Sequence, residues 1–219
     1  MLNLILDLDN TIISSIEMYK LSKLGNHSEN FEHIDMDTSF RVFKRPYLEE
    51  FLDYIFKNFK VSVFTAASKE YALFIIDNII LTKPNRKLDF IFFDHHVDIS
   101  ERKKKHPKYL ELLWKFYKFP GYNKENTFII DDNTLVHEKQ LKNVVKAKYF
   151  DVSTKKHSVG DTFLKDVIKE LKELSSTARE ATRKTSLASL ASSQSQKTTS
   201  LNSQDVVIGQ SACRKNVCK

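Results

Sequence analysis

The sequence predicts an α/β fold, a doubly wound and mostly parallel sheet flanked by helices, with a small hairpin or flap inserted after the first strand. Short apolar runs that predict buried strands alternate with helical patterns, which is typical of β-α-β units. The first run, over residues 2–8, ends in two carboxylates, Asp7 and Asp9. Ligands bind at the carboxyl ends of the strands in open α/β sheets, so we expect chemistry at this edge.

The segment after the first strand contains the predicted insertion. Residues 12–30 are polar, and residues 31–44 alternate in part between apolar and polar side chains, which favours an antiparallel hairpin or flap. Pro46 predicts the start of a helix, because the first helical position does not need a backbone N–H. The apolar residues from Tyr47 to Phe59 recur at helical spacing and predict a face that packs on the core.

The rest of the chain predicts further strands and helices in alternation. Ser68 is the predicted N-cap of a helix that ends near residue 80. Pro107 is the predicted start of a helix that ends near residue 117, with Lys108 on its first turn. The remaining predictions are strands over 61–65, 88–93, 127–130 and 148–151, a charged irregular segment over 94–105, and a last amphipathic helix over 161–174.

Composition predicts one globular domain, residues 1–174, and a disordered tail, residues 175–219. All 16 Phe lie before residue 164, whereas the tail is rich in Ser, Thr and Lys and contains no aromatic residue. Such a tail cannot bury enough apolar area to offset its ordering entropy. From Leu171 onward the chain has eight Lys and Arg against three Asp and Glu, so the basic pI is mostly a property of the tail and does not favour nucleic acid as a partner.

Several classes of protein are excluded by what the sequence contains. Both cysteines, Cys213 and Cys218, lie in the tail, so the core has no disulfide framework and no thiolate metal site. The four glycines form neither a dinucleotide-binding nor a P-loop motif. No apolar run has the length of a membrane span or the form of a signal peptide. We therefore expect an intracellular protein of the nucleus or cytoplasm, a monomer without membrane contact.

Polar residues at the predicted strand ends point to phosphoryl transfer. Each has an ordinary structural interpretation: Thr65 as a helix-entry hydroxyl, Lys108 as a solvated lysine, and the Asp131–Asp132 pair as a cap. Two carboxylates at one strand end repel each other, and a divalent cation or a shared proton offsets that cost. Taken together, the residues fit hydrolysis through an aspartyl phosphate, in which a carboxylate attacks phosphorus and water then releases phosphate.

The chemistry assigns a role to each of these side chains. Asp7 is the predicted nucleophile, and Asp9 is the predicted acid that protonates the leaving alkoxide and the base that then activates water. Lys108 and Thr65 complete the catalytic set as a positive charge and a hydroxyl donor at the phosphoryl oxygens. The predicted substrate-binding residues are Thr11, Thr65, Ala66 and Lys108. The predicted ligands of a Mg²⁺ cofactor are Asp7, the backbone carbonyl of Asp9, and Asp131 or Asp132.

The same stretches resemble a known family. Residues 4–11, residues 64–68, a lysine and residues 130–132 resemble the four motifs of the haloacid dehalogenase (HAD) superfamily. The stretch Lys44–Leu52, KRPYLEEFL, closely resembles the phosphatases of the RNA polymerase II C-terminal domain (CTD), including the small CTD phosphatases and NLI-interacting-factor-like proteins. The resemblance runs from residue 1 to about residue 174. It implies an HAD-like fold and a magnesium-dependent protein serine/threonine phosphatase with Asp7 as nucleophile and Asp9 as acid/base.

The sequence departs from this family at a few positions. Asn10 stands where the family usually has glutamate, and Asp132 stands where the small CTD phosphatases have asparagine, although larger relatives have an aspartate pair. Lys108 aligns best with the motif lysine, but extra residues over 116–123 separate it from the following strand. The stretch 84–105, which would shape a substrate groove, is dissimilar. The implied partner is a phosphoprotein, with the RNA polymerase II CTD as one candidate.

Two other functions remain open at this stage. One is a nucleic-acid 3′-end phosphatase on the same scaffold, for which Arg102 and the lysines at 103–105 are the only basic run in the core. The other is a phosphoprotein-binding scaffold with weak or no catalysis. The presence of Asp7, Asp9 and Thr65 weighs against the scaffold, because binding alone does not need a nucleophile.

Overall fold

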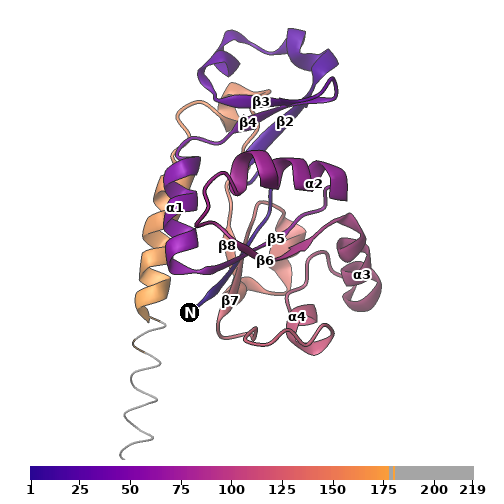
Figure 1. The fold of residues 1–219 in the computed structure, drawn as a ribbon, viewed down its shortest axis with the longest axis vertical. Coiled ribbons are helices and arrows are strands. Elements are labelled where there is room, and N and C mark those ends of the chain that lie inside the picture. The colour runs from indigo at the N-terminus through magenta and orange to yellow at the C-terminus, as the bar shows by residue number, and fades with distance from the viewer. Residues whose placement is uncertain (178–179, 181–219) are drawn as a thin grey trace, which may run out of the picture. The chain divides into compact units, whose positions relative to one another are not determined.

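Five parallel strands form the larger sheet, in the order β6-β5-β1-β7-β8 (Figure 1). The computed structural model describes residues 1–177 and residue 180. The strands of this sheet are β1 (Asn3–Leu6), β5 (Lys60–Phe64), β6 (Leu88–Phe92), β7 (Thr127–Asp131) and β8 (Val144–Lys146). The predicted α/β fold with a parallel sheet is confirmed.

The central strand β1 brings the first carboxylate to the middle of the sheet edge. It pairs with β5 on one side and with β7 on the other, and all four of its residues are buried. A strand covered on both faces favours apolar side chains, which explains the run Leu4–Leu6, whereas the buried amide of Asn3 is satisfied by hydrogen bonds to Gly121, Asn126 and Thr127. Three strands, β5, β1 and β7, therefore end side by side, and their carboxyl ends carry Thr65, Asp7 and Asp131.

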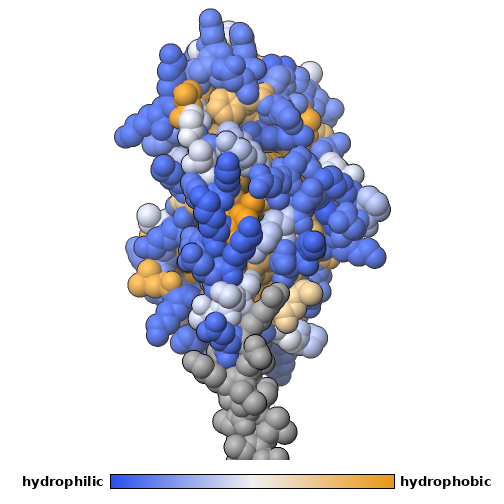
Figure 2. Space-filling view, turned by 90° about the vertical axis from the view of Figure 1, so that its left-hand side faces the viewer, coloured by the Kyte–Doolittle hydropathy of each residue, from blue (hydrophilic) through white to orange (hydrophobic). Residues whose placement is uncertain are grey.

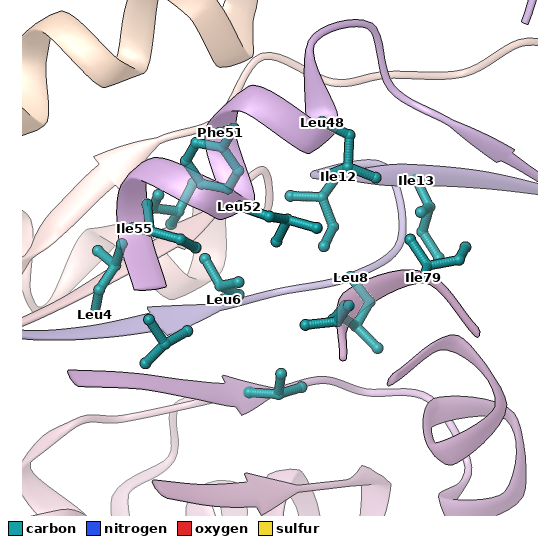
Figure 3. Packing of buried hydrophobic residues seen from close by; sticks show 14 of the residues in the cluster. Leu4, Leu6, Leu8, Ile12, Ile13, Leu48, Phe51, Leu52, Ile55 and Ile79 are labelled. Atoms are coloured by element: carbon teal, nitrogen blue, oxygen red, sulfur yellow. The ribbon is translucent and has the colours of Figure 1, made fainter. Parts of the chain in front are cut away.

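Helices cover both faces of the sheet. They are α1 (Leu48–Asn58), α2 (Lys69–Ile75), which a π-helical turn (Ile76–Ile80) continues, α3 (Asp94–Lys104), α4 (Glu111–Lys115) and α5 (Thr134–Glu138). Leu4 and Leu6 pack in one apolar cluster with α1, whereas Ile5 between them packs in a second cluster with residues of α4. In Figure 3, Ile55 of α1 lies beside Leu6 of β1 within the first cluster, which also contains Phe51 of α1. Alternate residues of the strand thus face alternate helix layers.

A three-stranded antiparallel sheet is inserted directly after the first carboxylate pair. It has the order β2-β4-β3 and is built from β2 (Ile13–Glu17), β3 (His33–Met36) and β4 (Phe40–Lys44). The hairpin predicted within residues 31–44 is confirmed as β3 and β4. The polar stretch before it contains elements that were not predicted: the third strand, β2, and two short 3₁₀ helices (Met18–Lys23 and Asn26–Asn30). We refer to β2, β3 and β4 as the insertion sheet.

The segment 94–105 was predicted to be irregular, and that prediction is wrong. Most of it is α3, whose acidic Asp94 lies in the first turn and whose last turn contains Arg102 and two lysines. Charges of these signs at these ends favour the helix dipole. At its start, the Phe93 backbone N–H donates to His96 Nδ1 at 3.1 Å. The charges that suggested a solvated loop therefore stabilise helix ends.

The helix predicted from Pro107 is also wrong at its start. Lys108 has φ 47°, in the left-handed region, and the helix α4 begins only at Glu111. The backbone N–H of Tyr109 donates to Ser100 Oγ at 2.9 Å, and that of Leu110 donates to the Gln140 side chain at 3.0 Å. Side chains from other elements satisfy these donors, so the segment need not be helical. Lys108 is therefore not on the first turn of a helix.

Two further boundaries differ from the predictions. The last strand of the described chain is β8, at Val144–Lys146, and not residues 148–151 as predicted. Residue Phe150 pairs with Asn10 instead, because the Phe150 N–H donates to the Asn10 carbonyl at 2.9 Å. Helix α1 begins at Leu48 rather than at Pro46, because Tyr47 is left-handed with φ 66°. Ser68, by contrast, caps α2 as predicted, since its side chain accepts from the Tyr71 N–H.

The chain from Met1 to Lys172 forms one compact unit. Two short 3₁₀ helices, Leu141–Asn143 and Lys155–His157, precede the last predicted helix, which begins at residue 163 and buries Leu164 and Leu171 in the first apolar cluster. On the α1 side, the surface is mainly hydrophilic (Figure 2). None of the described helices is long and apolar enough to cross a membrane. Of the predicted tail, residues 175–219, only residue 180 and residues 175–177, which continue the last helix, are among the described residues. The boundary at residue 174 stays a prediction.

Candidate active site

A cavity of about 660 Å³ opens at the carboxyl ends of β1, β5 and β7. It is lined by residues of the three strand ends, of α3, of the loop before α4 and of the first turn of α5. The lining residues include Asp7, Asp9, Thr65, Ala66, Val97, Glu101, Lys108, Asp132 and Leu135. The predicted gathering of polar side chains at one edge of the sheet is therefore present.

Lys108 lies between two buried carboxylates. Its Nζ is 2.7 Å from Asp7 Oδ1 and 2.8 Å from Asp131 Oδ2, and all three side chains are almost entirely inaccessible to solvent. The left-handed backbone at Lys108 turns the chain between α3 and α4 so that the side chain enters the sheet edge. Non-glycine residues adopt this conformation at a cost, and such residues cluster at functional sites.

Three aspartates form a candidate metal site. Oxygens of Asp7, Asp131 and Asp132 lie within 4.8 Å of one another. Three carboxylates with one lysine beside them leave excess negative charge, and hard cations such as Mg²⁺ prefer this set of oxygen ligands. The residues therefore fit a divalent cation. The side chain of Asp9 is outside this group, and the predicted contribution of its backbone carbonyl stays a prediction.

The pKa values in the site show the cost of gathering these charges. Burial raises the pKa of Asp7 to about 7, although the neighbouring ammonium of Lys108 opposes this. Burial also raises the pKa of Asp131 and of Asp132, with the charge of Asp7 adding to the shift at Asp132. Asp7 and Asp131 together hold the pKa of Lys108 at about 12 in spite of its burial. A bound cation would favour the ionised carboxylates.

Thr11 lies behind the cavity rather than on its wall. Its hydroxyl donates to Asp132 Oδ1 at 3.1 Å and accepts from the Asp132 backbone N–H at 3.2 Å. The side chain is buried and is not among those that line the cavity. This contact orients Asp132, whereas the predicted contact of Thr11 with substrate remains a prediction.

Thr65 and Ala66 lie on the cavity wall, as their predicted roles require. The Thr65 backbone N–H donates to the Phe92 carbonyl at 3.0 Å, which continues the pairing of β5 and β6. Its hydroxyl accepts from the Ala67 N–H at 3.1 Å and so shapes the turn into α2. A hydroxyl that accepts from its own turn keeps its proton free to donate toward the cavity.

Asp9 has a different environment from the other carboxylates. The Tyr71 hydroxyl donates to Asp9 Oδ1 at 2.6 Å, and Ser15 Oγ donates to the same oxygen at 3.3 Å. Burial raises the pKa of Asp9, with both hydrogen bonds acting in the opposite direction. Sequence reasoning missed Tyr71 and Ser15, since a tyrosine on a helix and a serine in a polar stretch are both unremarkable in isolation.

Sequence reasoning also missed two groups that support the site. Arg45 Nη1 donates to the Thr11 carbonyl at 2.6 Å, and the same guanidinium forms an ion pair with Asp161. The ring nitrogen Nε2 of His137 is 2.7 Å from the Asp131 carbonyl. The only signal for Arg45 was its place in the stretch Lys44–Leu52.

Comparisons with known proteins agree with the resemblance. A family model described as NLI interacting factor-like phosphatase matches residues 2–182. A CTD phosphatase-like protein 355R of Invertebrate iridescent virus 6 is 47% identical over 157 residues, which cover 68% of this chain and 86% of that protein. The 355R protein of Invertebrate iridescent virus 3 is 35% identical over 178 residues, 77% of this chain and 94% of its own.

Solved structures of CTD phosphatases also match. The structure of Fcp1, described as an essential RNA polymerase II CTD phosphatase, is 18% identical with a TM-score of 0.48. The match covers 85% of this chain and 53% of the Fcp1 chain, so the present chain spans about half the length of that relative. A structure of fission yeast Fcp1 bound to beryllium fluoride matches with a TM-score of 0.49 and 19% identity, over 87% of this chain and 56% of that one.

Proposed function

We propose that this chain, which belongs to the NLI interacting factor-like phosphatase family, hydrolyses phosphoserine and phosphothreonine esters of proteins with the help of Mg²⁺. One observation carries the proposal: the buried carboxylate of Asp7 lies 2.7 Å from the ammonium of Lys108, in a cavity that Asp9 also lines. A nucleophile, a positive charge and an acid/base group then face one volume. This is the set of groups that hydrolysis through an aspartyl phosphate needs.

The proposed reaction has two steps. In the first, an oxygen of Asp7 forms a bond to phosphorus, the bond from phosphorus to the serine oxygen breaks, and Asp9 gives its proton to that oxygen. In the second, Asp9 takes a proton from water as the water oxygen bonds to phosphorus and the bond to Asp7 breaks. Asp7 and Asp9 end in their initial states, and the products are the hydroxyl side chain and inorganic phosphate.

Other residues of the cavity supply charge and orientation. Lys108 would attract the phosphoryl oxygens, and the Thr65 hydroxyl would donate to one of them. Mg²⁺, held by Asp7, Asp131, Asp132 and the Asp9 carbonyl, would offset the mutual repulsion of phosphate and carboxylates. Thr11 would keep Asp132 in place for that role.

The proposed substrates are phosphorylated protein segments similar to the RNA polymerase II CTD. The support is that the relatives are described as CTD phosphatase-like and that the cavity is larger than a phosphate group alone requires. Apolar side chains, among them Val97 and Leu135, line the cavity walls and would contact residues that flank the phosphate. We propose action in the nucleus or cytoplasm, by a catalytic domain formed from residues 1–174.

Turnover of a phosphoserine peptide and of p-nitrophenyl phosphate tests the proposal. We expect Asp7→Asn to abolish hydrolysis of both substrates, because the amide cannot attack phosphorus. Asp166→Asn, which changes an exposed aspartate outside the cavity, is the matched control and should leave both rates unchanged. Full turnover by Asp7→Asn would reject the mechanism.

Two added measurements separate the alternatives. A 3′-phosphorylated oligonucleotide hydrolysed faster than the phosphoserine peptide would favour a nucleic-acid end phosphatase. Failure of beryllofluoride to bind in the presence of Mg²⁺, together with retained affinity for phosphopeptides, would favour a scaffold without catalysis. A phosphopeptide array probed with Asp9→Asn, which keeps the nucleophile but lacks the acid and base of both steps and should therefore retain bound phosphopeptides, would identify the preferred sequence.

A further inference from the structure

The acid/base candidate Asp9 forms a hydrogen-bonded group with two neighbouring side chains. Tyr71 and Ser15 each donate their one hydroxyl proton to Asp9 Oδ1, at 2.6 and 3.3 Å, and their two hydroxyl oxygens lie next to each other. Two donors on a single oxygen fix the rotation of the Asp9 carboxyl group. Once Asp9 has given up its proton, both hydrogen bonds are to a charged acceptor and become stronger than those between neutral groups.

The members of this group come from three different elements. Asp9 follows β1, Ser15 lies on β2 of the insertion sheet, and Tyr71 lies on α2. Phe40 of β4 also contacts the ring of Tyr71 edge-on, with ring centroids 5.6 Å apart and planes at 76°. The insertion sheet therefore holds Tyr71 by both its hydroxyl and its ring.

We infer that Tyr71, supported by Ser15 and Phe40, is a positioning residue that orients Asp9 as the general acid of phosphoryl transfer. The inference rests on the proposed function, and it gives the insertion sheet a part in catalysis in addition to any part in substrate binding. A phenol is protonated at neutral pH, so Tyr71 is a constant donor and does not compete for the proton that is transferred.

The hydrogen bonds also decide which oxygen of Asp9 delivers the proton. Because Oδ1 accepts from Tyr71 and Ser15, the acidic proton of Asp9 lies on Oδ2. As the bond from phosphorus to the serine oxygen breaks, its electron pair stays on that oxygen, which takes the proton from Oδ2. Water returns a proton to Oδ2 in the second step, and Tyr71 keeps its own proton throughout.

The dependence of rate on the leaving group tests this inference. An alkoxide such as that of serine needs a proton in the transition state, whereas p-nitrophenolate leaves with little help. The constant kcat/KM reports only the steps up to the first irreversible transfer, so it isolates the action of the acid. Loss of orientation at Asp9 should therefore lower kcat/KM far more for the phosphoserine peptide than for p-nitrophenyl phosphate.

For Tyr71→Phe we expect kcat/KM to fall about 10- to 100-fold on the phosphoserine peptide, at the lower end of what general acid catalysis supplies, and by less than about threefold on p-nitrophenyl phosphate. The variant keeps the ring that packs on Phe40. Ser15→Ala removes the longer of the two hydrogen bonds to Asp9, from a different element. It should change the ratio of kcat/KM on the two substrates in the same direction by a smaller factor. It also keeps the test available if Tyr71→Phe does not fold.

Tyr122→Phe is the matched control. The Tyr122 hydroxyl donates to Asp89 at 2.8 Å and contacts Ser62, and the residue does not line the cavity with Asp9. Removing this hydroxyl costs a comparable hydrogen bond, and the ratio of the two kcat/KM values should stay at the wild-type value.

The outcomes separate this inference from the proposed function. Equal losses on both substrates in Tyr71→Phe would show a purely structural role, and unchanged kcat/KM on both would show no role, so either result overturns the inference alone. A wild-type chain that hydrolyses neither substrate, or Asp7→Asn with full turnover, overturns the proposed function and the inference with it.

Discussion

Arg45 and Asp161 form a bidentate ion pair inside the protein, with Nη2–Oδ2 at 2.7 Å and Nε–Oδ1 at 2.9 Å. The side chain of Arg45 is fully buried and lies over the rings of Phe150 and Phe163, at 5.1 and 4.4 Å from their centroids. The same guanidinium donates to the Thr11 carbonyl. One residue thus joins the loop after the first strand to the end of the compact unit.

The first prediction concerns this ion pair. Arg45→Met leaves the carboxylate of Asp161 buried without its partner, and breaking such a pair costs about 3–5 kcal/mol of unfolding free energy. Urea denaturation measures the loss. The control is Arg41→Gln, which breaks an exposed pair with Asp35 and should cost about 0–1 kcal/mol. Equal losses in both variants would contradict the prediction.

The second prediction concerns Lys108. Lys108→Met should lower kcat about 10²–10³-fold, the effect of removing one group that stabilises transition-state charge. Lys105→Met is a suitable control, because Lys105 is also a left-handed lysine, with φ 52°, but does not line the cavity. Steady-state kinetics on p-nitrophenyl phosphate measures both. Similar kcat values in the two variants would show that the charge of Lys108 does not contribute to catalysis.

The third prediction concerns the metal site. Mg²⁺ should stabilise the folded chain, by about 2.7 kcal/mol when its concentration is 100 times its dissociation constant. Asp131→Asn with Asp132→Asn should remove most of this effect, because two of the three clustered carboxylates are gone. Thermal unfolding with and without EDTA measures it. Stabilisation by Mg²⁺ that survives in the double variant would place the ion elsewhere.

The fourth prediction concerns the dependence of stability on pH without metal. The pKa of Asp7 is about 7 in the folded state, above its ordinary value of 3.8, so the folded state binds more protons than the unfolded state between these values. Ionised Asp7 therefore costs stability as the pH rises from about 4 to 7. Asp7→Asn should gain stability relative to the wild type over this range, as measured by denaturation in EDTA.

A control with the opposite sign is available for this prediction. Arg41 lowers the pKa of Asp35, so the stabilisation from Asp35 is present above its unfolded pKa and is lost as the pH falls. The stability of Asp35→Asn relative to the wild type should therefore not rise with pH. A common trend in both variants would indicate a general charge effect.

The local pattern was sufficient to predict most of the sheet and the strand-end residues. Apolar runs and the polar residues that follow them are local features of a sequence. Asp7, Thr65 and Asp131 each come at the end of such a run, and each lies at the carboxyl end of a strand. The predicted conformation at Lys108 was wrong because the donors of Tyr109 and Leu110 bond to Ser100 and Gln140, contacts that no local pattern encodes.

The missed contacts at Asp9 have a similar cause. Ser15 and Tyr71 are 56 residues apart, and their meeting depends on how the insertion sheet lies against α2. Strand β2 itself was missed because its sequence, ISSIE, shows no alternation: its two isoleucines are separated by a pair of serines. The strand forms through its antiparallel pairing with β4, a contact that the residues of β2 alone do not indicate.

Asn10 and Phe150 are joined in both directions, since the Phe150 N–H donates to the Asn10 carbonyl and Asn10 Nδ2 donates to the Phe150 carbonyl at 3.0 Å. Together with the ion pair between Arg45 and Asp161, this clamp means that the loop carrying the first two aspartates is supported by residues far along the chain, 140 positions on for Phe150 from Asn10 and 116 for Asp161 from Arg45. In a nascent chain whose residue 161 is still inside the ribosome, the two supports could not both be in place, so this loop could take up its final position only after that residue has emerged.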